Sequence, residues 1–147
     1  MKKETIILML LLVVSELRNI QLTHKYEVLL SKQESVIVTG TMYNAVQGQC
    51  DSDPLLTAGM YRIDPNNASK QRYVALSRDL IKRWGGMFDY GDIIKIEGAG
   101  FKNGFYKVVD TMNKRFKNRM DFLETKGTKH YKFNNIKITK VTSVSLT

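Results

Sequence analysis

From residue 35 onward the chain alternates between short segments with the composition of β-strands and groups of turn-forming residues. Residues 36–43 are rich in β-branched and aromatic side chains, and a loop of Gly, Asn, Gln, Asp, Ser and Pro follows them to about Pro54. Asn103-Gly104 is a dipeptide typical of a tight turn between two strands. Further strands are predicted at residues 59–63, 72–76, 92–97, 104–109, 119–123 and 135–141.

A single helix is predicted among these strands, over residues 77–84. Ser77 is a good N-cap, Asp79 suits the positive end of the helix dipole, and the following two glycines are typical of a helix end. A chain of six or seven short strands with one helix favours a compact β-barrel, because closure removes exposed sheet edges. We therefore expect a mainly β fold.

The first fifteen residues differ in composition from the rest. Lys2 and Lys3 precede an apolar run over residues 6–14, and the small Ser15 follows, an order typical of a secretory signal peptide. The run is shorter than the roughly 20 apolar residues of a membrane-spanning helix. We expect a signal segment over 1–15, a linker or short helix over 16–34, the barrel domain over 35–142 and a tail over 143–147. The alternatives are a short buried helix or an uncleaved anchor; in the leading interpretation the protein is exported, has no stable membrane span and is a monomer.

The net charge and the metal-ligating residue types limit which classes of partner and cofactor the chain could bind. The net charge of +9 favours an anionic partner, such as nucleic acid, anionic lipid or a cell-wall polymer, without choosing among them. Cys50 is the one cysteine, so no intrachain disulfide is possible. His24 and His130 stand alone in the sequence, without a second ligand at metal spacing. No metal or organic cofactor is therefore expected.

Two aspartates in the last third of the chain stand in apolar, strand-forming surroundings. Asp110 follows two valines, and Asp121 lies between a methionine and a phenylalanine. Because a strand alternates between buried and exposed positions, either carboxyl could be partly desolvated, which raises its pKa and suits a general acid. The alternative from spacing alone is that both aspartates cap turns and face water.

Short motifs occur in a fixed order over most of the chain. They are Thr41-Met-Tyr43, Thr57-Ala-Gly59, Val74-Ala-Leu-Ser-Arg-Asp79, Tyr90-Gly-Asp-Ile-Ile-Lys-Ile96, Val109-Asp-Thr-Met-Asn113 and Asn118-Arg-Met-Asp-Phe122. This order resembles the three-aspartate domain, a double-psi β-barrel shared with the membrane-bound lytic transglycosylase A family and, more distantly, with rare lipoprotein A and expansins. The resemblance covers residues 36–141 and is most specific around the two aspartates.

The resemblance implies a six-stranded double-psi barrel that cleaves the glycan strands of peptidoglycan without hydrolysis. It implies Asp121 as the general acid and base and Asp110 as the neighbour that tunes and orients it. Residues expected to bind substrate are Tyr43, Thr57, Asp79, Thr111 and Asn113, with Thr41 as a further donor.

One position departs from the family pattern. The family's first aspartate falls here on Ser77, and Asp79 follows two residues later, where it could replace the missing carboxylate or only stabilise a helix. Two other functions stay open, the first because of this departure and the second because of the positive net charge. One is a non-catalytic wall-binding or wall-loosening barrel of the same fold. The other is a basic nucleic-acid-binding barrel, which the lack of a basic and aromatic stacking series disfavours, so that no nucleic acid is expected as a partner.

Overall fold

The computed structural model describes residues 2–31, 34–46 and 53–141. The chain divides into two compact units, residues 1–33 and residues 34–147. Cys50 and the tail expected over residues 143–147 lie outside the described residues.

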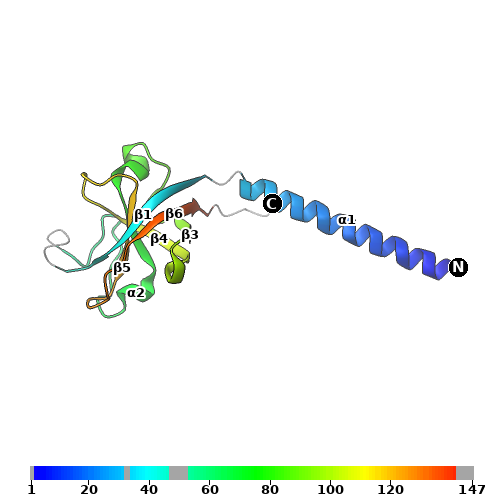
Figure 1. The fold of residues 1–147 in the computed structure, drawn as a ribbon, viewed down its shortest axis with the longest axis horizontal. Helices are drawn as coiled ribbons and strands as arrows, with labels where there is room; N and C mark the ends of the chain where they lie inside the picture. The colour runs from blue at the N-terminus through cyan, green and yellow to red at the C-terminus, as the bar shows by residue number, and fades with distance from the viewer. Residues whose placement is uncertain (1, 32–33, 47–52, 142–147) are drawn as a thin grey trace. The chain divides into compact units, whose positions relative to one another are not determined.

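Six strands of the second unit close into a β-barrel, as the sequence predicts (Figure 1). The order around the barrel is β1-β5-β2-β4-β3-β6. The strands are β1 (Ser35–Asn44), β2 (Tyr73–Leu76), β3 (Ile93–Glu97), β4 (Gly104–Thr111), β5 (Arg119–Glu124) and β6 (Phe133–Lys140). The remaining elements of this unit are the short helix α2 (Ala68–Gln71) and three 3-10 turns, η1 (Arg78–Leu80), η2 (Lys82–Trp84) and η3 (Gly100–Lys102).

The barrel is mixed, because two of its strand pairs are parallel. β1 runs parallel to β5 and β2 runs parallel to β4, while the other four pairs are antiparallel. Parallel partners need long connections, and each of these pairs is separated in sequence by other strands. The chain therefore brings residues from distant segments into neighbouring positions near the strand ends.

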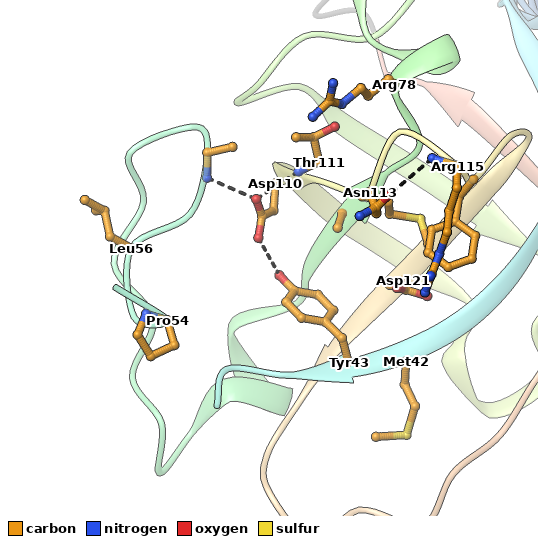
Figure 2. A pocket seen from close by; sticks show the side chains of 14 residues that line it. Met42, Tyr43, Pro54, Leu56, Arg78, Asp110, Thr111, Asn113, Arg115 and Asp121 are labelled. Atoms are coloured by element: carbon orange, nitrogen blue, oxygen red, sulfur yellow. Dashed lines mark hydrogen bonds between the residues drawn. The ribbon is translucent and has the colours of Figure 1, made fainter. Parts of the chain in front are cut away.

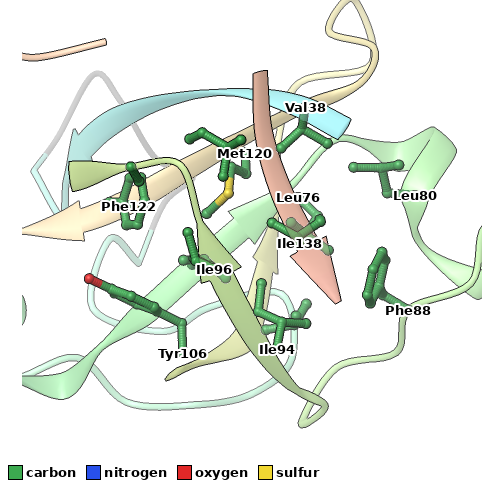
Figure 3. Packing of buried hydrophobic residues seen from close by; sticks show 14 of the residues in the cluster. Val38, Leu76, Leu80, Phe88, Ile94, Ile96, Tyr106, Met120, Phe122 and Ile138 are labelled. Atoms are coloured by element: carbon green, nitrogen blue, oxygen red, sulfur yellow. The ribbon is translucent and has the colours of Figure 1, made fainter. Parts of the chain in front are cut away.

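Apolar side chains fill the interior of the barrel (Figure 3). In β5, Met120 and Phe122 are fully buried while Asp121 between them is only half-buried, as the period of two along a strand requires. The ring of Tyr106 from β4 meets that of Phe122 edge-on at 5.2 Å. The other core residues labelled in Figure 3 are Val38, Leu76, Leu80, Phe88, Ile94, Ile96 and Ile138.

Two local sequence predictions are wrong. Residues 59–63 form no strand; they belong to a loop held by an isolated bridge between Leu56 and Arg62. The helix expected over residues 77–84 is replaced by η1 and η2, which the extended backbone of Ile81 separates. Ile81 is fully buried and forms a parallel bridge with Phe88, so its packing outweighs the helical pattern of the segment. The expected end is confirmed, because Gly85 adopts φ 95° after η2.

The first unit consists of one helix, α1 (Lys3–Ser31). The helix continues past residue 15, so most of the segment expected as a linker or short helix over 16–34 is helical. Its portion from Lys3 to Lys25 contains an 18-residue window with a mean hydropathy of 1.7 and is long and apolar enough to cross a membrane. A signal sequence meets the same criteria of length and composition.

Candidate active site

Asp121 and Asp110 lie in one row of residues that crosses four strands of the barrel. Thr41 of β1 pairs with Asp121 of β5, and Asp121 pairs with Ala75 of β2. Ala75 in turn pairs with Asp110 of β4. The barrel topology therefore brings together two carboxylates and a threonine from three separate parts of the sequence.

A β-bulge in β4 turns Asp110 toward this row. Val74 pairs with Val108, but the next residue of β2, Ala75, pairs with Asp110, so Val109 is an extra residue in the ladder. Tyr106 and Val108 belong to the core, and strict alternation would put Asp110 there as well. The extra residue reverses the alternation, and Asp110 lies on the same surface as Asp121.

The row opens into a groove of about 630 Å³ (Figure 2). Four of the residues predicted to form the site, besides Asp121, line it: Tyr43, Asp110, Thr111 and Asn113. The other lining residues are Met42, Pro54, Leu56, Ala58, Ala75, Arg78, Met112, Arg115 and Phe116. The groove thus combines acidic, basic, hydroxyl and apolar groups, as a site for a polar and partly apolar molecule requires.

Asp121 has the environment of a proton donor. Burial raises the pKa of its carboxyl above the usual value, against the opposing effects of a hydrogen bond from Thr41 and the positive charge of Arg119. The Thr41 hydroxyl donates to Oδ1. Among the described residues, no hydrogen bond reaches the other carboxylate oxygen, Oδ2, which can carry a proton.

Asp110 is held as an acceptor of several hydrogen bonds. Its Oδ1 accepts from the backbone N–H of Ala58 at 3.0 Å and of Thr111 at 2.9 Å, and its Oδ2 accepts from the Tyr43 hydroxyl at 3.4 Å. Asp110 is not among the causes of the pKa shift of Asp121. Its contacts instead join β1, β4 and the loop that contains Ala58.

Gly59 fixes that loop against the bulge. Its N–H donates to the carbonyl oxygen of Val109 at 2.8 Å. A Cβ atom at this position would lie 2.7 Å from the same oxygen, which is too close for any side chain. The absence of a side chain at Gly59 therefore allows the loop to approach the bulge and the Ala58 N–H to reach Asp110.

Thr57 and Asp79, two of the five residues predicted to bind substrate, do not line the groove, and neither does the further predicted donor Thr41. Thr57 is only 3% exposed, and its Oγ1 accepts a hydrogen bond from the Tyr61 N–H at 3.0 Å within the same loop. Asp79 accepts from the Asn118 N–H at 2.9 Å. Burial works to raise the pKa of Asp79, but this bond and further hydrogen bonds lower it on balance. Both side chains hold the backbone near the site.

Ser77 occupies the position where the family pattern has its first aspartate, and it is fully buried. Its hydroxyl accepts a hydrogen bond from the Arg119 N–H at 3.0 Å, and its own N–H donates to the Arg119 carbonyl at 2.9 Å. Ser77 therefore fixes the start of β5, two residues before Asp121, and does not line the groove.

The sequence prediction missed the two arginines of the groove, Arg78 and Arg115. Both belong to segments that follow a strand, one after β2 and one between β4 and β5. Arg115 lies only two residues after Asn113, and the backbone N–H of Arg115 donates to the Asn113 Oδ1 at 3.1 Å. The closeness of Arg115 to a predicted site residue is the one sequence feature that could have indicated it. Because the chain contains many other basic residues, this closeness alone does not single out Arg115.

No protein-family model matches the chain, and no curated protein matches it significantly. Within the described residues, no three His, Cys, Asp or Glu side chains form a group that could hold a metal ion.

Proposed function

We propose that this protein is an exported lytic transglycosylase that cleaves peptidoglycan glycan strands, and that its barrel is a double-psi barrel. The observation that carries the proposal is the half-buried Asp121 in an open groove, with a raised pKa and one carboxylate oxygen held by Thr41. The mixed strand order and the motif resemblance support the same assignment. The apolar stretch of α1 from Lys3 to Lys25 supports export, because a signal sequence near the N-terminus meets the same criteria of length and composition.

The proposed reaction uses one carboxyl group in two roles. Protonated Asp121 donates its proton to the glycosidic oxygen between N-acetylmuramic acid and N-acetylglucosamine as the C1–O bond breaks. The Asp121 carboxylate then takes the proton of the muramic 6-hydroxyl as that oxygen bonds to C1. The products are an anhydromuramic end and a new 4-hydroxyl, and Asp121 is protonated again.

Because the attacking oxygen belongs to the substrate, this reaction needs no second catalytic carboxylate. Asp110 then acts as a positioning residue, through its hydrogen bonds to Tyr43 and to the backbone of Ala58. These bonds hold one wall of the groove in place. A fixed wall orients the sugar and restricts the access of water, which would otherwise give hydrolysis.

The test is digestion of purified sacculi by the full-length protein, followed by mass spectrometry of the soluble products. Anhydromuramic ends are expected. Reducing muramic ends would instead indicate hydrolysis and would exclude the proposed reaction.

A second candidate is a non-catalytic wall-binding module, and the burial of Ser77 favours it. The groove contains no carboxylate at the position of the family's first aspartate, and Asp79, whose Oδ2 accepts the Asn118 N–H, does not line it. A binding module would sediment with sacculi and release no soluble fragments, even after prolonged incubation with excess protein. A transglycosylase would release fragments under the same conditions.

A further inference from the structure

Arg78 and Arg115 bring two positive charges to the groove that also contains Asp110 and Asp121 (Figure 2). Among the described residues, no Asp or Glu carboxylate lies within ion-pair distance of either guanidinium group. In every ion pair between described residues, the positive partner is a lysine. The two arginines are therefore not neutralised by the carboxylates beside them in the groove.

Aromatic rings hold both guanidinium groups. The Arg78 guanidinium lies over the Trp84 ring at 5.1 Å, and the Arg115 guanidinium lies over the Phe116 ring at 4.8 Å. Within the described part of the chain, the buried Nε of Arg78 has no hydrogen-bond partner. An arginine stacked on a ring has lost part of its freedom before a ligand arrives, so it binds an anion at a smaller entropic cost.

We infer that Arg78 and Arg115 form a subsite for a carboxylate carried by the glycan beside the bond that is cleaved. This inference rests on the proposed function, because it assigns the substrate class of the same groove. A guanidinium group binds a carboxylate through two parallel hydrogen bonds, which adds direction as well as charge. The glycan of the cell wall offers two sources of this group: the lactyl carboxylate of muramic acid and the carboxylates of its peptide.

The subsite also explains how a groove with two aspartates accepts an acidic substrate. The Asp110 carboxylate, and Asp121 whenever it is ionised, would repel a carboxylate, and two arginines in the same groove offset that repulsion. A neutral glycan would gain nothing from them. The groove therefore selects acidic glycan over a neutral polymer of N-acetylglucosamine.

The test measures binding of the full-length Asp121→Asn protein, in mild detergent, to four forms of glycan, each attached to beads because strands freed of their cross-linking peptides no longer sediment. Sacculi with peptides and sacculi freed of peptides by an amidase are each used directly or after carbodiimide and methylamine have converted their carboxylates into neutral amides. The amidase-treated form presents the lactyl carboxylate, and the untreated form presents the peptide carboxylates. The form whose neutralisation weakens binding identifies the source.

Neutralisation is expected to weaken binding at least about tenfold for one of the two forms, the loss that a charge-assisted hydrogen bond implies. Arg78→Gln with Arg115→Gln should weaken binding to the acidic form by a similar factor and leave binding to the neutral form unchanged. The matched controls are Arg83→Gln and Lys114→Gln. The guanidinium of Arg83 also lies over the Trp84 ring, and Lys114 is next to Arg115 in the sequence. Neither lines the groove, and both should bind as the parent does.

Equal binding of acidic and neutral glycan would overturn the subsite, and so would equal losses in the control variants. The glycan comparison needs only the parent protein, so it decides the question even if the arginine variants do not fold. Release of anhydromuramic ends by the wild-type protein is measured in parallel. Release with charge-independent binding contradicts the subsite alone, whereas charge-dependent binding without release contradicts the proposed reaction alone.

Discussion

Asp110 and Asp121 flank the same residue of β2, Ala75, one from β4 and the other from β5. Neighbouring strands lie roughly 4.8 Å apart, so the backbones of the two aspartates are separated by about 10 Å. The carboxylates therefore share a groove without sharing a strand pair. In the proposed reaction, this arrangement separates proton transfer at Asp121 from the positioning of the groove wall by Asp110.

Asp110→Asn tests that separation. The amide keeps one oxygen for the N–H groups of Ala58 and Thr111 but loses the second acceptor that Tyr43 uses. We expect a lower rate of release of anhydromuramic ends, by roughly tenfold, the loss typical of poorer orientation. The pH at which the rate falls to half should stay unchanged. A clear displacement of that pH would show that the Asp110 charge sets the protonation of Asp121.

Thr41→Val tests the hydrogen bond to Asp121. This bond favours the charged carboxylate, so its loss should raise the pKa of Asp121 further. In the proposed reaction the protonated acid is the active form, so the alkaline limb of the pH–rate profile should move to higher pH. Thr39→Val, in the same strand but not among the residues that line the groove, is the control and should leave the profile unchanged. A shift to lower pH in Thr41→Val would contradict the account.

Asp121→Asn should make the barrel more stable at neutral pH. A carboxyl with a raised pKa binds its proton more strongly in the folded state, so wild-type stability falls as pH rises above the ordinary value of 3.8 and through the raised pKa. The variant lacks this loss. Its thermal midpoint should exceed that of the wild type at neutral pH, and the difference should disappear in acid.

Asp79→Asn provides a control of opposite sign. The pKa of Asp79 is lowered, so its carboxylate stabilises the fold above the ordinary value, and this stability is lost as pH falls through the lowered pKa. The variant should therefore melt below the wild type at neutral pH. If the two variants changed the midpoint in the same direction, the assigned environments would be wrong.

Gly59→Ala tests the contact between the loop and the β-bulge. The new methyl group would lie 2.7 Å from the Val109 carbonyl oxygen, so the loop must move away from β4. Forcing extra atoms into a packed site costs about 1–3 kcal/mol. We expect a lower thermal midpoint in calorimetry and slower release of product. An unchanged midpoint would show that the loop does not depend on this approach.

The sequence supports the position of Asp121 better than that of Asp110. Asp121 lies between two large apolar residues of a regular strand, and alternation alone places it outside the core. Asp110 reaches the same surface only because Val109 is an extra residue in β4, and nothing in the local composition marks a bulge. Its pairing with Ala75 depends on a strand more than thirty residues away in sequence.

The failed helix prediction has a similar cause. Residues 77–84 have caps and an apolar face at helical spacing, but Ile81 gains more by packing beside Phe88 in an extended conformation. The two arginines of the groove could not be predicted for another reason. The chain contains 23 lysines and arginines, and no local pattern distinguishes the two that line the groove. Tertiary contacts decide both cases.

In the proposed reaction, Asp121 carries out the proton transfers by which anhydromuramic ends form. The most direct measurement is mass spectrometry of the soluble products released from purified sacculi by wild-type and Asp121→Asn protein at equal concentration. The wild type should release anhydromuramic fragments, and the variant should release them at least about 100-fold more slowly while it still sediments with sacculi. Equal release by the two proteins would contradict the account.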